Sequence, residues 1–132
     1  MSKELYWLAL TLAATALFVF PYVLNRIVVR GLVGAMSNPS PNDKPVAKWA
    51  ERAQRAHANA VENLVVFAPA VIAVHVLARG DAFTANACAV YFCARVLHYV
   101  VYTAGIPYVR TLSFFAGWFA TAALIGRLLG VL

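Results

Sequence analysis

The sequence predicts an all-α integral membrane protein, a bundle of four transmembrane helices that forms a single domain over residues 1–132. Of the 132 residues, 63% are hydrophobic and only 12% are charged, whereas a soluble domain has roughly 45–50% apolar and about 25% charged residues. A spanning helix needs about 20 mostly apolar residues. The length therefore allows four spans with short connections and no separate soluble domain.

The first helix is predicted over residues 3–30. Tyr6 and Trp7 stand at its start, where aromatic side chains anchor at a membrane interface, and Arg30 marks its other end. The apolar run over residues 5–23 is longer than the core of a signal peptide, which has about 7–15 residues. We therefore expect a retained helix rather than a cleaved signal.

The second helix is predicted over residues 46–78, after the longest loop, residues 31–45. Glycine, proline, asparagine and aspartate are dense in this loop, and no periodic pattern survives there. The first part of the helix, residues 48–63, is polar and charged, and the remainder is almost wholly apolar. We expect the polar half to enter the hydrocarbon with its charges turned toward protein.

The third and fourth helices are predicted over residues 82–104 and 107–132. Positive charge is distributed unevenly between the two ends of the four helices. The richer end carries Arg26, Arg30, Lys44, Lys48, Arg52, Arg55 and Arg110, and the opposite end carries Lys3, Arg79 and Arg127. Lysine and arginine favour the cytoplasmic side, so we expect a bacterial inner-membrane protein with the 31–45 loop in the cytoplasm.

Two polar stripes lie inside the predicted spans, where polar residues are costly and mark candidate functional sites. On the second helix, Arg55, Asn59 and Glu62 have spacings i, i+4 and i+7 and share one face, with Arg52 on the same side one turn earlier. The second stripe, on the third helix, comprises Tyr91, Arg95, His98 and Tyr102, and Arg110 follows at the start of the fourth helix.

Both stripes reach the same membrane face, so we expect them to converge on one pocket. Arginine forks suit carboxylates, and the carboxylate of Glu62 suits an ammonium group. The complementary ligand is a small zwitterion with excess carboxylate, a description that glutathione meets. The alternative is that Arg55, Glu62 and Arg95 form ion pairs that only hold the bundle together. His57, which lies off the main face, is interpreted as a structural hydrogen-bond donor.

The remaining composition narrows the possible partners. The net charge of +6 comes mainly from helix ends, which favours anionic lipid headgroups or an anionic ligand over nucleic acid. The three histidines have no ligand-like spacing, so no metal is expected. Cys88 and Cys93 fall inside an apolar span and are interpreted as small packing residues.

The segment from Arg55 to Asn63 resembles the RAxxNxxE signature of the MAPEG family, the membrane-associated proteins of eicosanoid and glutathione metabolism. The resemblance extends over essentially the whole chain. It implies a homotrimer with glutathione sites between neighbouring subunits. Together with the stripe on the second helix, it assigns ligand binding to Arg30, Arg52, Arg55, Asn59, Glu62, His98 and Tyr102. Arg110 matches the arginine that favours the thiolate, with Tyr102 as a hydrogen-bond donor to the thiol.

Three positions depart from individual branches of the family. Ala58 stands in place of an arginine of prostaglandin-synthase-like members, and Asn63 in place of a tyrosine of leukotriene-synthase-like members. Phe114 also replaces a tyrosine. These differences favour a general glutathione transferase or peroxidase, acting on a hydrophobic electrophile or lipid hydroperoxide, over a lipid-mediator synthase.

Two other functional classes remain open. The first is a non-catalytic trimeric membrane protein that binds an anionic lipid or thiol in a structural or carrier role. The second is a small channel or proton-linked transporter, which ranks last because the first span offers few polar groups.

Overall fold

The computed structural model describes residues 1–132 and is entirely helical. Its helices are α1 (Lys3–Leu17), α2 (Val19–Met36), α3 (Lys48–Val76), α4 (Ala82–Ala104) and α5 (Pro107–Leu129). The first two form one continuous span, Lys3–Met36, so four helices are long and apolar enough to cross a membrane. The predicted fold class is confirmed.

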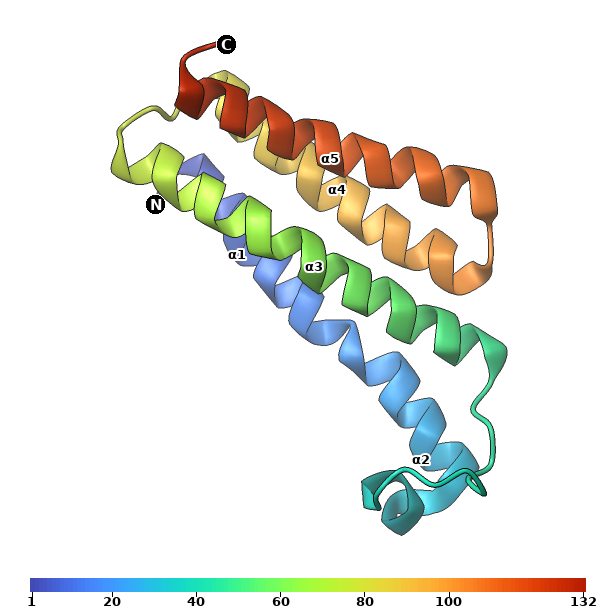
Figure 1. The fold of residues 1–132 in the computed structure, drawn as a ribbon. Coiled ribbons are helices and arrows are strands. Elements are labelled where there is room, and N and C mark those ends of the chain that lie inside the picture. Colours follow the sequence, from blue (N-terminus) through green and yellow to red (C-terminus); the bar gives the residue numbers. More distant parts are fainter.

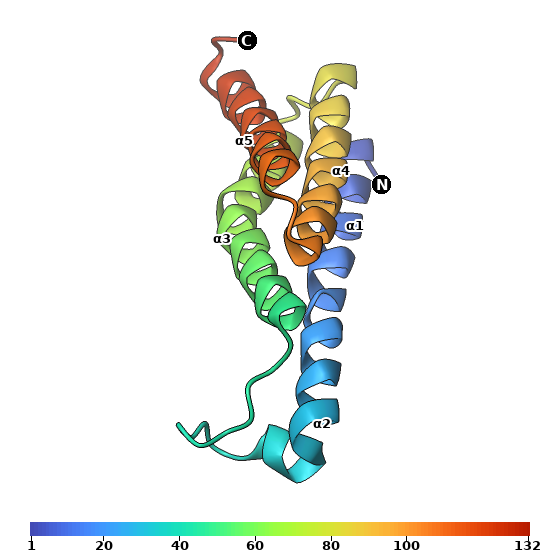
Figure 2. The same ribbon diagram turned by 90° about the vertical axis from the view of Figure 1, so that its right-hand side faces the viewer.

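The helices pack as an up-and-down bundle in which α4 and α5 form a hairpin and α1–α2 runs alongside α3 (Figures 1 and 2). Both termini and the α3–α4 turn lie at one end of the bundle. The α4–α5 turn and the beginning of α3 lie at the other end, and α2 projects beyond it. The two ends therefore correspond to the charge-poor and charge-rich sides of the sequence.

The first span is interrupted at Phe18, between α1 and α2. Pro21 has no backbone N–H, so it cannot bond the carbonyl of Leu17, four residues earlier. At the break, the carbonyl of Phe18 accepts a hydrogen bond from the hydroxyl of Tyr99 at 3.0 Å. The two rings stack with centroids 3.9 Å apart. The carbonyl of Phe18 at the break thus has a side-chain partner inside the span, where water is scarce.

Several predicted boundaries are wrong by a few residues. The first span continues six residues past Arg30, to Met36. Gly31 adopts φ +74° and kinks the backbone there, but the chain resumes a helical course after it. The fourth helix ends at Leu129 rather than 132, because Gly130 takes the left-handed conformation that terminates helices. The second begins at Lys48 and ends at Val76, and the third covers 82–104 as expected.

The polar half of α3 packs inward through alanines. The methyl groups of Ala50, Ala53, Ala56 and Ala60 are all buried, which lets the helix approach its neighbours closely. Arg55 and Glu62 consequently point outward and are exposed. The expectation that the charges of this half turn toward protein holds for Arg52, which bonds the carbonyl of Thr103 on α4. It does not hold for Arg55 within the single chain, because the small residues occupy the inward face.

Candidate functional site

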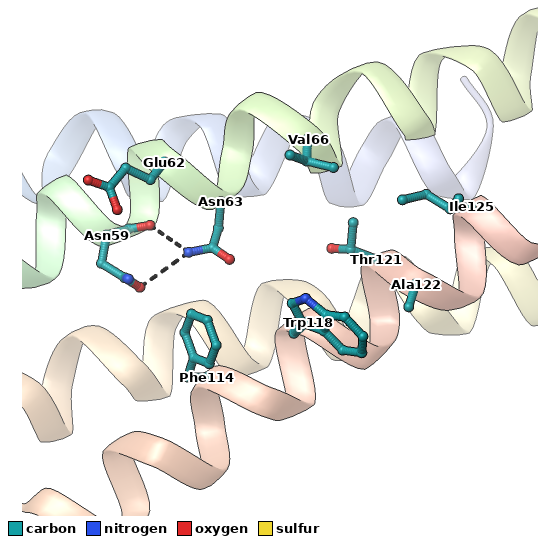
Figure 3. Close-up of a pocket in the computed structure, with 9 residues that line it drawn as sticks. All are labelled: Asn59, Glu62, Asn63, Val66, Phe114, Trp118, Thr121, Ala122 and Ile125. Atoms are coloured by element: carbon teal, nitrogen blue, oxygen red, sulfur yellow. Dashed lines mark hydrogen bonds between the residues drawn. The ribbon is translucent and has the colours of Figure 1, made fainter.

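A cavity of about 400 Å³ lies between α3 and α5 (Figure 3). It has a polar end and an apolar end. Its lining consists of Asn59, Glu62, Asn63 and Val66 from α3 and Phe114, Trp118, Thr121, Ala122 and Ile125 from α5. The α3 residues follow one another at three- and four-residue spacing, as do those of α5, so each helix contributes one continuous stripe.

An amide pair forms the polar end of the cavity. The Nδ2 of Asn63 donates to the backbone carbonyl of Asn59 at 2.8 Å and to its Oδ1 at 3.3 Å (Figure 3). The Nη1 of Arg95 donates to the same Oδ1 at 3.2 Å. Asn59 is therefore held from two sides, by its own helix and by α4.

Arg95 is buried to 3% exposure and has no carboxylate partner. Besides Asn59, its guanidinium donates to two backbone carbonyls of α5, those of Ser113 at 3.4 Å and Phe114 at 3.0 Å. Its Nε has no partner. Gly117 leaves room for the group, since a Cβ there would lie 2.9 Å from Nε. Arg95 thus links α3, α4 and α5 through neutral acceptors.

The chain contains two ion pairs, Arg30–Asp43 and Arg127–Asp81. Neither involves Arg55, Glu62 or Arg95. Within the single chain these three residues therefore form no ion pair, and Arg95 joins the helices through neutral acceptors instead.

The last two residues of the second stripe, His98 and Tyr102, lie toward the charge-rich end, whereas Tyr91 is buried in the core against Phe67. His98 is 4% exposed, and its ring meets that of Tyr102 edge-on at a centroid distance of 5.5 Å. The Cζ of Arg110 lies 4.7 Å from the centroid of the Tyr102 ring. Phe114, whose ring centroid is 6.3 Å from that of His98, connects this group to the cavity. The structure thus brings together the three predicted site residues of α4 and α5, namely His98, Tyr102 and Arg110.

The remaining predicted ligands lie apart from the cavity. Arg52 donates from Nε to the carbonyl of Thr103 at 2.9 Å and so caps the end of α4. Arg30 donates to the carbonyl of Lys44 at 2.8 Å and pairs with Asp43 at 3.4 Å, so it fastens the α2–α3 loop. Arg55 lines a separate surface depression beside Glu51, Gln54 and Ala58. The single chain does not bring Arg30, Arg52 or Arg55 to the cavity.

The other histidines and the cysteines lie outside this site. His57 shares a 2.8 Å hydrogen bond with the hydroxyl of Tyr22, which joins α3 to α2. His75 is exposed near the opposite end. Cys88 is buried in the core and Cys93 is exposed, and they form no disulfide. No group of three or more His, Cys, Asp or Glu side chains is placed to hold a metal ion.

Sequence reasoning missed the apolar end of the cavity. Trp118, Thr121 and Ile125 were not predicted as site residues, although their spacing places them on the α5 face that carries Phe114. Once α3 and α5 are known to be neighbours, aligning this face of α5 with Asn59 and Val66 of α3 identifies these residues. Such pairing depends on tertiary contact, which periodicity alone does not give.

The sequence matches the model of the MAPEG family over residues 5–130, nearly the whole chain. A search of curated proteins and a search of solved structures each give no match. The assignment to a family therefore rests on the match to the family model.

Proposed function

The chain belongs to the MAPEG family, and from this premise we propose that it is a membrane-bound glutathione transferase or glutathione-dependent peroxidase. Membership supports a membrane protein of glutathione or eicosanoid metabolism. The observation that carries the finer proposal is the cavity between α3 and α5, which joins a polar end to an apolar end. Such a site suits a peptide thiol and a hydrophobic co-substrate side by side.

The polar end is proposed to hold glutathione. Asn59 supplies an amide and Glu62 an exposed carboxylate on the same face of α3. The carboxylate would bind the ammonium of the tripeptide. The apolar end, lined by Val66, Trp118 and Ile125, would take a hydrophobic electrophile that diffuses in from the lipid, which gives a physical reason for placing this chemistry in a membrane.

Arg110 and Tyr102 are the proposed catalytic residues. A free thiol has a pKa near 8.5, and a neighbouring cation lowers it. Arg110 would stabilise the thiolate, and the hydroxyl of Tyr102, whose ring lies under its guanidinium, would donate a hydrogen bond to the sulfur. In conjugation by substitution, the thiolate forms a carbon–sulfur bond while the bond to the leaving group breaks and the leaving group takes its electron pair. The thiol proton goes to solvent or to that leaving group. With a hydroperoxide, two glutathione molecules yield the disulfide, an alcohol and water.

We further propose that the site is completed by a neighbouring subunit of a homotrimer. Arg55 and Glu62 are exposed on α3, with Glu62 at the cavity. Arg30 lies in α2 and bonds the α2–α3 loop. All three could therefore meet ligand at a subunit boundary. Arg52 would fix the end of α4 through the carbonyl of Thr103. His98 would pack against the ring of Tyr102 and so help to position it. The charge bias supports a cytoplasmic α2–α3 loop, and a bacterial inner membrane is the proposed location.

The test is stopped-flow absorbance near 240 nm on detergent-purified protein mixed with glutathione. Wild type is expected to give a saturable thiolate signal that Arg110→Ala abolishes. Lys3→Ala removes an exposed cation at the opposite end and should leave the signal unchanged. If wild type gives no thiolate and glutathione produces no thermal stabilisation, the proposal is wrong.

A second candidate is a non-catalytic trimer that binds an anionic lipid or thiol. Two observations favour it: Phe114 lines the cavity without a hydroxyl, and neither Arg110 nor Tyr102 lines it. Under this candidate, glutathione or an anionic lipid raises the melting temperature while wild type shows neither thiolate nor turnover. Turnover that depends on Arg110 would exclude it.

A further inference from the structure

The orientation of the Asn59 side chain is determined by its neighbours. Arg95 carries only N–H donors, so the Asn59 atom that faces it at 3.2 Å must be the amide oxygen. Asn63 is oriented by the same logic, because a backbone carbonyl only accepts and its Nδ2 lies 2.8 Å from the carbonyl of Asn59. That Nδ2 then also donates to Oδ1 of Asn59.

Both lone pairs of the Asn59 amide oxygen are therefore occupied by protein donors, one from Arg95 and one from Asn63. The amide nitrogen of Asn59 donates to no protein group, and the residue lines the cavity. The only hydrogen-bonding capacity that Asn59 has left for a ligand is its N–H₂ group.

From this network we infer that Arg95 and Asn63 are positioning residues that present Asn59 as a hydrogen-bond donor, so that this subsite binds an acceptor, a carbonyl or carboxylate oxygen of the thiol peptide. The inference rests on the proposed function and deepens it. Arg95 acts through Asn59 and touches neither the ligand nor the sulfur.

Burial explains why this arrangement holds. Arg95 is 3% exposed and is fixed on α5 by the carbonyl of Phe114 at 3.0 Å. Gly117 beneath it has no side chain that would displace it. A rotated Asn59 amide would place its N–H₂ against the buried cation and against the Nδ2 of Asn63, which would leave donors facing donors beside a buried guanidinium.

The test is a double-mutant cycle read as glutathione Kd by isothermal titration calorimetry in detergent. Arg95→Met is expected to weaken binding about tenfold in wild type, which is the scale of one lost hydrogen bond. In the Asn59→Ala background the same substitution should weaken binding less than twofold, because the residue through which it acts is gone. The kcat at saturating glutathione should stay within about twofold of wild type.

Controls separate positioning from charge and from folding. Arg95→Lys should recover part of the glutathione affinity lost in Arg95→Met. Arg79→Met removes an arginine at the opposite end of the bundle and should leave the glutathione Kd unchanged. If Arg95→Met does not fold, Asn63→Ala supplies the same cycle, because it removes the second donor to Asn59.

The outcomes separate the inference from the proposed function. Equal weakening of binding in the wild-type and Asn59→Ala backgrounds would overturn the inference and leave the glutathione site standing. Absence of glutathione binding in wild type would overturn both. Loss of affinity confined to backgrounds that retain Asn59 would support the inference.

Discussion

The guanidinium of Arg110 lies over the ring of Tyr102, with Cζ 4.7 Å from the ring centroid. The two residues come from different helices, α5 and α4. A cation over an aromatic face is attracted by the ring quadrupole, by about 0.5–2 kcal/mol depending on exposure. Tyr102 can therefore contribute in two separable ways, by its ring to the position of Arg110 and by its hydroxyl to a bound thiol.

Tyr102→Phe separates these contributions. The ring remains, so Arg110 keeps its contact with the aromatic face, and the melting temperature in detergent should change little. The hydroxyl is lost, so the thiolate signal near 240 nm should fall several-fold if that group stabilises the sulfur, which is the scale of one hydrogen bond to a charged group.

The matched control for this prediction is Tyr108→Phe. Tyr108 is 83% exposed and makes no contact in the site, so its hydroxyl should be dispensable. An unchanged thiolate signal in Tyr102→Phe would remove the hydroxyl from the mechanism and leave the tyrosine only its role beneath Arg110.

Gly117→Ala tests whether the guanidinium of Arg95 is held tightly against α5. The added Cβ would lie 2.9 Å from both Nε and Nη2 of the guanidinium, closer than atoms pack without a shift. Overpacking of this kind costs about 1–3 kcal/mol, so the melting temperature should fall measurably. Ala116→Val adds bulk at the neighbouring exposed position and should leave it nearly unchanged. A Gly117→Ala protein as stable as wild type would mean that Arg95 moves freely.

The sequence predicted the parts of the site that depend on helical periodicity. Asn59 and Glu62 were assigned to one face and both line the cavity, and His98, Tyr102 and Arg110 come together as expected. Periodicity fixes which residues share a face of one helix. It does not fix which helix that face meets, and for this reason the α5 lining of the cavity was missed.

The opposite end of the bundle shows the same limit. Glu4, in the first turn of α1, is 5% exposed and accepts a 2.7 Å hydrogen bond from Thr84, 80 positions away. The absence of a side chain at Gly80 makes room for it, since a Cβ there would lie 2.9 Å from its Oε1. Burial that depends on a distant glycine leaves no local pattern in the sequence.

Asp81 at this end should make stability depend on pH. The backbone N–H of Thr84, which donates to its Oδ1 at 2.9 Å, and then Arg127 lower the pKa of Asp81 below its ordinary value. A lowered pKa in the folded state means that the contribution to stability is complete above the unfolded pKa, about 3.9. It is lost as the pH falls further, through the folded pKa.

The measurement is the melting temperature in detergent of wild type and Asp81→Asn between about pH 7 and pH 3, a range that spans the ordinary aspartate pKa. Asparagine also caps helices, so the variant keeps the turn but loses the titration. The difference between the two proteins should be constant above about pH 5 and shrink below about pH 4. A difference that grows as the pH falls would contradict the assigned sign.

Ala122→Leu tests whether the apolar end of the cavity takes the hydrophobic co-substrate. Ala122 lines the cavity one turn from Trp118, so a leucine there fills space that a bulky electrophile would need. The KM for a large hydrophobic electrophile should rise about tenfold, while the KM for a small one and the Kd for glutathione stay near wild type, because the polar end is untouched. Ala116→Leu, on the same helix but outside the cavity lining, should change neither constant. If Ala122→Leu raises the KM of large and small electrophiles alike, the co-substrate reaches the thiol by another route.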